Sequence, residues 1–271
     1  MRNVVSLLAV VMVLFGFTTD ARLPVSARTA IQRDTAASEA VLAQARKALG
    51  GEKRLASIRS IHARGQRRTR MPGLEETLEA DFEFGLSPFE RYVLRENVAW
   101  PSSVDISGFD GTRLIRDGWS TSADGPQLTI GRIKPDVERR VLRLRRNQAM
   151  RLALALLLPS GTAGFQYGTP MPVTSPDGDA NSIEVTRPED FAATLFLDAV
   201  THRPLLMKHV DDSTPQSTGI ASIGLEEYRT VDQVLLPHRL MFQTSRNATT
   251  QWDVKAYWFN DSGAFARLTR R

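Results

Sequence analysis

Few side chains in this sequence have the types and spacing that catalysis or metal binding needs. His202 and His209 are seven residues apart, with a proline between them, and Asp211 and Asp212 follow. A metal site would need a third ligand and a closer spacing, for which the two aspartates are weak candidates. No Gly-x-Ser-x-Gly sequence occurs, and Ser160 follows an expected helix instead of preceding one. We therefore predict no catalytic residues, no metal and no cofactor, although sequence alone does not exclude a hydrolase site assembled by folding.

The composition narrows the class of protein further. The chain has 271 residues and no cysteine, which excludes disulfides, thiol catalysis and an acylated cysteine at a mature N-terminus. Hydrophobic residues make up 42% and charged residues 24%, as in ordinary soluble globular proteins. The net charge of +5 comes mostly from arginine, and no zinc-finger, RNP or P-loop pattern accompanies it. We predict no nucleic-acid partner; a peripheral contact with an anionic membrane surface stays open.

The first residues are typical of a secretory signal peptide. A basic start is followed by the apolar run Val4–Phe17 and then by small and polar residues. The run is shorter than the roughly 20 residues that span a bilayer, so an uncleaved anchor is the less favoured alternative. Cleavage could follow Ala21 or Ala27, and the small-residue pair before Ala27 favours the second site. We expect residues 1–27 to be removed and residues 28–271 to be exported as one domain.

Two stretches alternate between apolar and polar side chains, which predicts β-strands with one face in water. The segment 76–84 alternates in this way, and Trp252, Val254, Ala256 and Trp258 repeat the pattern near the C-terminus. Other short strands are separated by turn signals such as Asp110-Gly111. This spacing predicts an antiparallel meander, and hence an α+β protein that is mainly antiparallel β.

Two helices are expected to pack on that sheet. Residues 38–49 form an amphipathic stretch ended by Gly50-Gly51, and residues 134–158 form one long helix stopped by Pro159. The long helix has an apolar side and becomes apolar all round near its end, so we expect it to act as a buried lid. The candidate lid residues are Val141, Leu144, Leu152 and Leu156. Its other side carries Arg139, Arg143 and Arg146, either as a solvated face or as a surface for anions or a partner.

The apolar strand faces could form a packed core or line a cavity for an apolar ligand. A curved sheet rich in aromatic side chains must be filled by something, and a partly filled barrel is a natural site for acyl chains. The candidate cavity residues are Leu78, Phe82, Phe84, Tyr92, Leu94, Leu195, Leu197, Leu240, Phe242, Trp252, Val254 and Trp258.

The order of these pieces resembles the LolA/LolB-like family of periplasmic lipoprotein carriers. The resemblance is carried by Leu49-Gly-Gly51, Gly108-Phe-Asp-Gly111, Leu195-Phe-Leu-Asp198 and Leu236-Pro-His-Arg239. It implies an open, incomplete antiparallel β-barrel with helices covering the concave face and an apolar cavity that takes up acyl chains. The absence of cysteine makes the chain more similar to the soluble carrier than to the lipid-anchored receptor.

The sequence also departs from that family. A tryptophan usually follows the Gly108–Gly111 turn closely, whereas here Leu114-Ile115 occupy that place and Trp119 comes later. The mature chain is longer than the usual carrier, and the family's key arginine is not assigned to any one of Arg59, Arg64, Arg67 or Arg91. We expect a monomeric, non-enzymatic carrier or binding protein for a lipid, acyl chain or lipoprotein. The alternative is an exported structural or regulatory envelope protein with a packed interior, which would contact an envelope-protein partner through its surface.

Overall fold

The computed structural model describes most of the chain after the expected signal peptide, which itself lies outside the described residues. The described ranges are 35–73, 76–88, 90–99, 102–122, 125–128, 134–158, 164–175, 178–187, 191–212 and 219–270. They all fall within one compact unit, Gln32–Arg271.

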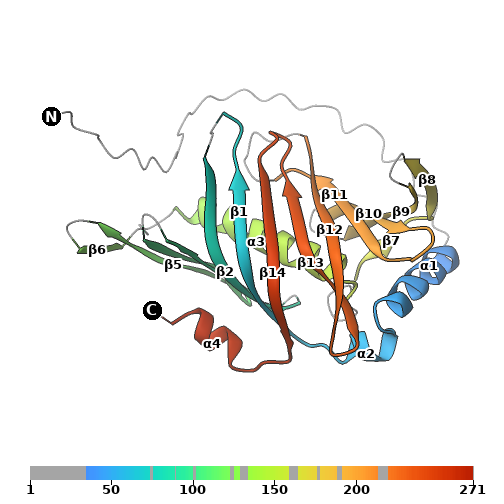
Figure 1. Cartoon of the computed structure of the whole chain (residues 1–271), viewed down its shortest axis with the longest axis horizontal. Helices are drawn as coiled ribbons and strands as arrows, with labels where there is room; N and C mark the ends of the chain where they lie inside the picture. Colours follow the sequence, from blue (N-terminus) through green and yellow to red (C-terminus); the bar gives the residue numbers. More distant parts are fainter. Residues whose placement is uncertain are drawn as a thin grey trace. The chain divides into compact units, whose positions relative to one another are not determined.

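Long strands and a few helices make up this unit (Figure 1). The helices are α1 (Thr35–Ala48), α2 (Glu52–Ala56), α3 (Pro135–Ala155) and α4 (Ala264–Leu268). The first strands are β1 (Ile61–Arg70), β2 (Thr77–Ser87), β3 (Arg91–Val98), β4 (Ser103–Asp110), β5 (Arg113–Ser122) and β6 (Gly125–Leu128). The later strands are β7 (Gln166–Tyr167), β8 (Met171–Ser175), β9 (Gly178–Arg187), β10 (Phe191–Asp198), β11 (Pro204–Val210), β12 (Ile220–Val231), β13 (Val234–Gln243) and β14 (Thr249–Phe259).

All these strands join one antiparallel sheet, as predicted. Its order is β6-β5-β4-β3-β2-β1-β14-β13-β12-β11-β10-β9-β7, and β8 pairs with β9. Two meanders therefore run outward from the central pair β1 and β14, which are far apart in sequence but pair with each other along their whole length, with one register shift between Arg64 and Gly65. Within the described chain, the strands at the two ends of this order do not pair with each other, so the sheet is open.

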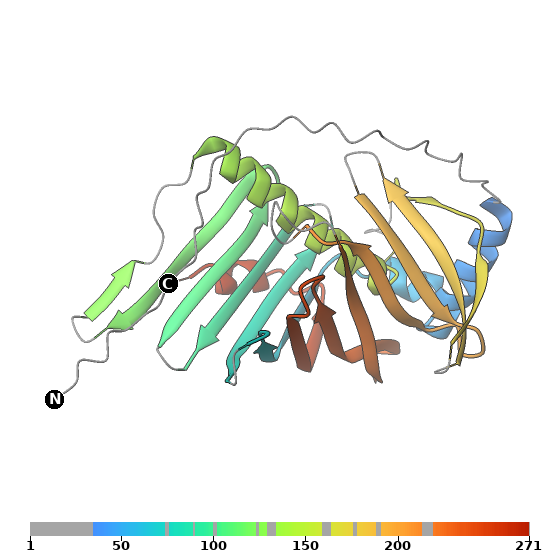
Figure 2. The same cartoon turned by 90° about the horizontal axis from the view of Figure 1, so that it is seen from above.

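Helix α3 lies across one side of the sheet, which we call the inner face, and α4 lies on the opposite, outer face (Figure 2). Lys134 precedes Pro135 at the start of α3, where proline suits the first turn, and Asp136 and Glu138 complement the helix dipole there. The buried side chains of α3 begin at Asn147, so only its C-terminal half enters the core.

Helices α1 and α2 close one end of the core. Leu42 and Ala45 on α1, Leu49 directly after it and Leu55 on α2 are fully buried in the main apolar cluster. The Leu49 carbonyl accepts a hydrogen bond from the amide of Leu235 on β13, which ties the end of α1 to the sheet. The predicted helix at residues 38–49 and its Gly50-Gly51 end are thus confirmed, one turn longer at the start.

The predicted alternation along β14 is wrong beyond Val254. Arg64 pairs with Ala256, but the next residue, Gly65, pairs with Val254, so Lys255 is an extra residue in a β-bulge. The bulge reverses the two faces, and Tyr257 is buried while Trp258 is 37% exposed on the outer face. Gly65 permits this close approach, because a Cβ there would lie 2.1 Å from the Asp253 carbonyl oxygen.

We expect Gly65→Ala to lower the free energy of unfolding by about 1–3 kcal/mol, because the added methyl forces β1 and β14 apart at the bulge. Urea unfolding followed by far-UV circular dichroism measures this change. Gly224→Ala on β12 is the matched control, since its Cβ would make ordinary contacts with Met241, at 3.4 Å from Cβ and 3.9 Å from the carbonyl oxygen. Equal costs for the two variants would contradict the importance of the bulge.

Candidate functional site

Most of the predicted cavity residues converge on the inner face beneath α3. Those that are at most 4% exposed are Phe82, Phe84, Tyr92, Leu94, Leu195, Leu197, Leu240, Trp252 and Val254. Phe242 is partly buried and packs against the same cluster. These side chains are therefore part of the buried core on the inner face, to which strands of both meanders contribute.

An aromatic group joins the two meanders at the centre of this surface. The ring of Trp252 on β14 stacks on Phe82 of β2 with centroids 4.6 Å apart, and Phe242 of β13 lies 4.9 Å from Trp252. Phe84 is 5.7 Å from Trp252. Such contacts add to the burial of large apolar surfaces and hold the neighbouring strands in register.

Two predicted cavity residues lie outside the interior. Leu78 is 47% exposed near the start of β2, where core packing has ended although the alternation continues. Trp258 points to the outer face because of the bulge at Lys255. Neither residue belongs to the inner surface.

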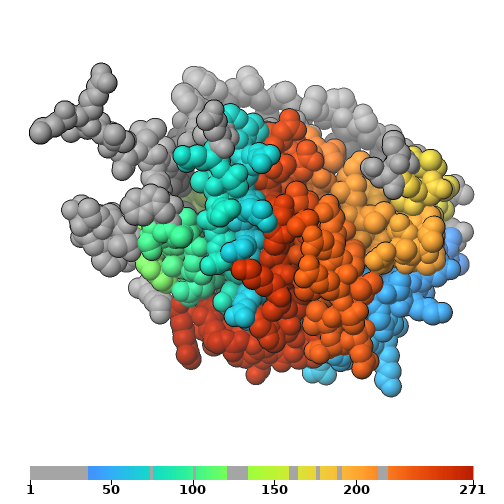
Figure 3. All heavy atoms as spheres, in the orientation of Figure 1, coloured from blue at the N-terminus to red at the C-terminus, as the bar shows by residue number. Residues whose placement is uncertain are grey.

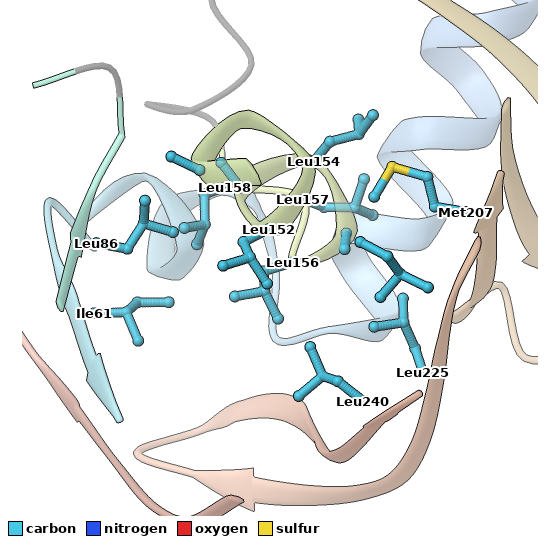
Figure 4. Packing of buried hydrophobic residues seen from close by; sticks show 14 of the residues in the cluster. Ile61, Leu86, Leu152, Leu154, Leu156, Leu157, Leu158, Met207, Leu225 and Leu240 are labelled. Carbon is cyan, nitrogen blue, oxygen red and sulfur yellow. The ribbon is translucent and has the colours of Figure 1, made fainter. Parts of the chain in front are cut away.

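The end of α3 covers the inner surface with its own leucines. Residues 152–158 are each at most 2% exposed. Figure 4 shows their leucine side chains between the strands carrying Ile61 and Leu86 on one side and those carrying Met207 and Leu225 on the other. Of the predicted lid residues, Leu152 and Leu156 are buried here, whereas Val141 and Leu144 are only half-buried.

A charged contact that the sequence did not indicate fastens α3 to the sheet. Arg151 of α3 donates two hydrogen bonds to the carboxylate of Asp212, at 3.0 and 2.6 Å, and Asn147 donates a third at 3.1 Å. Burial alone would raise the pKa of Asp212, but the hydrogen bonds and charge of Arg151 outweigh it and lower that pKa. Asp211 instead accepts hydrogen bonds from Ser245, so neither aspartate is arranged around the two histidines.

Polar side chains form a band on the inner face next to the apolar region. Arg67 of β1 reaches Glu96 of β3 and forms an ion pair at 2.6 Å. Burial raises the pKa of Glu96, and Arg67 counteracts that effect only in part. The hydroxyls of Tyr92 and Ser107 and the indole N–H of Trp252 are buried without a hydrogen-bond partner among the described residues. This band could receive the polar end of a ligand.

The three arginines proposed as an anion or partner surface have different environments. Arg139 and Arg143 are exposed on α3. Arg146 instead donates a hydrogen bond to the Gly111 carbonyl at 2.9 Å, and its guanidinium lies 5.9 Å from the Phe109 ring centroid. Arg146 therefore helps to seat α3 on the β4–β5 turn.

Comparison with solved structures identifies the class of fold. A LolA superfamily protein from Nitrosomonas europaea aligns with a TM-score of 0.52 and 11% identity over 87% of this chain and 98% of its own. A DUF1329 family protein from Desulfovibrio piger gives 0.50 and 11%, over 83% and 94%. A putative outer membrane lipoprotein-sorting protein domain from Vibrio parahaemolyticus gives 0.50 and 10%, over 86% and 100%. The sequence matches no protein-family model and no curated protein.

The chain thus has a LolA-like fold, an open antiparallel sheet with helices on its concave side, as the sequence resemblance predicted. Among the described residues, no helix is both long and apolar enough to cross a membrane. The described part of the chain also holds no group of three or more acidic or histidine side chains that could bind a metal ion.

We expect Asp212→Asn to lower the free energy of unfolding at pH 7 by about 1–3 kcal/mol, because the Arg151 guanidinium loses its charged acceptors. The pKa of Asp212 is lower in the folded chain than in the unfolded one. Its contribution is therefore complete above the unfolded value of about 3.9 and is lost as pH falls through the folded value.

Urea unfolding at pH 7 and at pH 3 checks the sign of this effect. The wild-type protein should lose more stability between the two pH values than Asp212→Asn does. The exposed Asp179→Asn is the matched control and should leave the wild-type difference unchanged. An equal pH dependence in Asp212→Asn and the wild type would contradict the stabilising role of the carboxylate.

Proposed function

We propose that this protein is an exported, periplasmic and non-enzymatic carrier or binding protein for a lipid, an acyl chain or a lipidated protein. The observation that carries the proposal is the apolar segment 152–158, formed by the end of α3 and the three residues after it, lying against the inner face of an open LolA-like sheet. In this mechanism the end of α3 moves away and an acyl chain takes its place.

The free energies of burying the leucines and an acyl chain are similar enough to allow such an exchange. The segment contains five leucines, and burying each one contributes about 1.5–3 kcal/mol, or about 8–15 kcal/mol together. An acyl chain of about 16 methylenes would gain about 13 kcal/mol from the same environment. Because the two terms are comparable, a ligand of this length can offset the exposure of the helix end.

The polar band beside the apolar region supports the same proposal. Arg67 and Glu96, with the unpartnered hydroxyls of Tyr92 and Ser107, would face the head group of a ligand whose chain lies against Trp252. The expected signal peptide would place the protein where lipids and lipoproteins cross the envelope. A lipidated protein is then the expected partner, and the exposed side chains Arg139 and Arg143 of α3 are the proposed contact with anionic head groups.

A second candidate function has one observation in its favour. The inner surface is already covered by the chain's own side chains, with nine of the twelve predicted cavity residues at most 4% exposed. A protein with a permanently packed interior would act through its surface, as a structural or regulatory component of the envelope. The two candidates differ in whether α3 ever leaves the interior.

Quenching by a brominated fatty acid separates the two candidates. We expect a variant retaining Trp252 as its only tryptophan to be quenched in a saturable manner, because the bromines would lie against that ring. A variant retaining only Trp258, on the outer face, is the control and should not be quenched. Equal quenching of both variants, or none of Trp252 at a high micromolar probe concentration, would favour the packed interior.

Cross-linking α3 to the sheet tests the exchange itself. The chain has no cysteine, so Asn147→Cys with Asp212→Cys creates the only thiol pair, at side chains whose polar atoms are 3.1 Å apart. A short bismaleimide across this pair should abolish uptake of the brominated chain. The same variant capped with N-ethylmaleimide should retain it, and uptake by the cross-linked form would refute movement of α3.

A further inference from the structure

The outer face carries a second hollow, separate from the interior beneath α3. It lies where the C-terminal segment meets strands β14, β1, β2 and β3, and Figure 3 shows that segment (red) beside β1 and β2 (cyan). Its volume is about 620 Å³, within the range of roughly 300–1,000 Å³ that is typical of small-molecule sites. The lining residues are His62, Arg64, Glu83, Arg95, Asn97, Trp258, Asp261 and Arg267.

The register of the sheet and the seating of α4 create this hollow. Arg64, Glu83 and Arg95 are directly opposite one another on β1, β2 and β3, and His62 lies opposite Trp258 and Gly85. Gly85 carries no side chain, and a Cβ there would be 3.0 Å from both Leu268 and Phe265. The missing side chain lets α4 approach the sheet and form one wall.

His62 is a buried polar side chain that the protein does not fully satisfy. The residue is 6% exposed and its ring stacks on Trp258 with centroids 4.8 Å apart. Its Nε2 lies 3.4 Å from a Glu83 oxygen, whereas Nδ1 is 3.8 Å from Asp261, too far for a hydrogen bond. Among the described residues Nδ1 has no hydrogen-bond partner, which is unusual for a buried nitrogen.

The guanidinium of Arg64 is positioned to bind an anion. Its guanidinium lies 5.3 Å from the Trp258 ring centroid and forms no ion pair with a described carboxylate. Stacking on an aromatic ring fixes the guanidinium plane and leaves its N–H groups free to bind a carboxylate or phosphate through two hydrogen bonds. The exposed guanidinium of Arg64 can therefore bind an oxyanion from solvent.

The remaining charges also favour an anion. Arg267 is paired with Asp261, which cancels both charges locally. Arg95 donates to the Arg270 carbonyl at 2.6 Å but keeps its positive charge. The two positive charges of Arg64 and Arg95 thus outnumber the single negative charge of Glu83 in this pocket. No described group of acidic or histidine side chains here suits a metal cation.

We propose that this outer pocket binds a small-molecule oxyanion, a carboxylate or a phosphate, through Arg64 with His62 and Trp258 beside it. The site is independent of the acyl-chain function proposed for the interior, because its side chains point to the opposite face of the sheet. A protein that fails to take up lipid can therefore still bind the anion.

Titration with inorganic phosphate and with acetate, at constant ionic strength set by sodium chloride, tests the proposal. The readout is the indole N–H signal of Trp258 in ¹H–¹⁵N spectra, assigned with Trp258→Phe. We expect a saturable shift that Arg64→Gln weakens about tenfold or more, because a charge-assisted pair is lost. The anion that binds more tightly identifies the chemistry of the ligand.

Arg70→Gln is the matched control, since Arg70 is exposed on the same strand and the variant changes the net charge equally. It should alter binding by less than about twofold. Arg64→Lys, which keeps the charge but not the planar fork, should bind with intermediate strength. No shift at Trp258 with either anion, or equal weakening by Arg64→Gln and Arg70→Gln, would overturn the proposal.

Discussion

Burial of one apolar helix end against the inner face of an open sheet is the interaction on which the rest of this structure depends. A closed barrel can be filled by its own strand side chains, but an open sheet leaves one face that water would otherwise reach. Here residues 152–158, which are the end of α3 and the three residues after it, cover that face, and α1 and α2 close it at one end. The sheet order, the aromatic group around Trp252 and the ion pair at Asp212 all depend on this placement.

The two faces of the sheet are kept distinct by a single irregularity. The β-bulge at Lys255 reverses which alternate side chains of β14 face the interior. Trp252 therefore lies in the interior and Trp258 in the outer pocket. Without the bulge, Trp258 would enter a core that already holds Trp252 and Phe82. One extra residue thus supplies aromatic surface to two separate sites on opposite faces of the same strand.

Periodic patterns in the sequence predicted the strands and helices, because these elements depend on residues close together in the chain. Alternation around Phe82 and the apolar end of the long helix both followed from side-chain periodicity, and both elements are confirmed in an open antiparallel sheet. The hydrogen bonds of Arg151 to Asp212 join residues 61 positions apart, and no periodic pattern in the sequence indicates them. The outer pocket was missed for the same reason, since it needs the short α4 to return to β2 and β3 over Gly85.

Buried leucines alone do not distinguish a packed core from an acyl-chain site, because a helix end and a hydrocarbon chain bury the same kind of surface. The polar atoms beside the leucines also need a partner in either case. A self-sufficient core pairs nearly all its polar groups, since each unpaired one costs on the order of 1–3 kcal/mol. Here Tyr92, Ser107 and Trp252 keep buried polar atoms without a partner in the described chain, next to the charged Arg67 and Glu96. Ordered water would satisfy those atoms in a permanently packed interior, and a ligand head group would satisfy them under the carrier proposal.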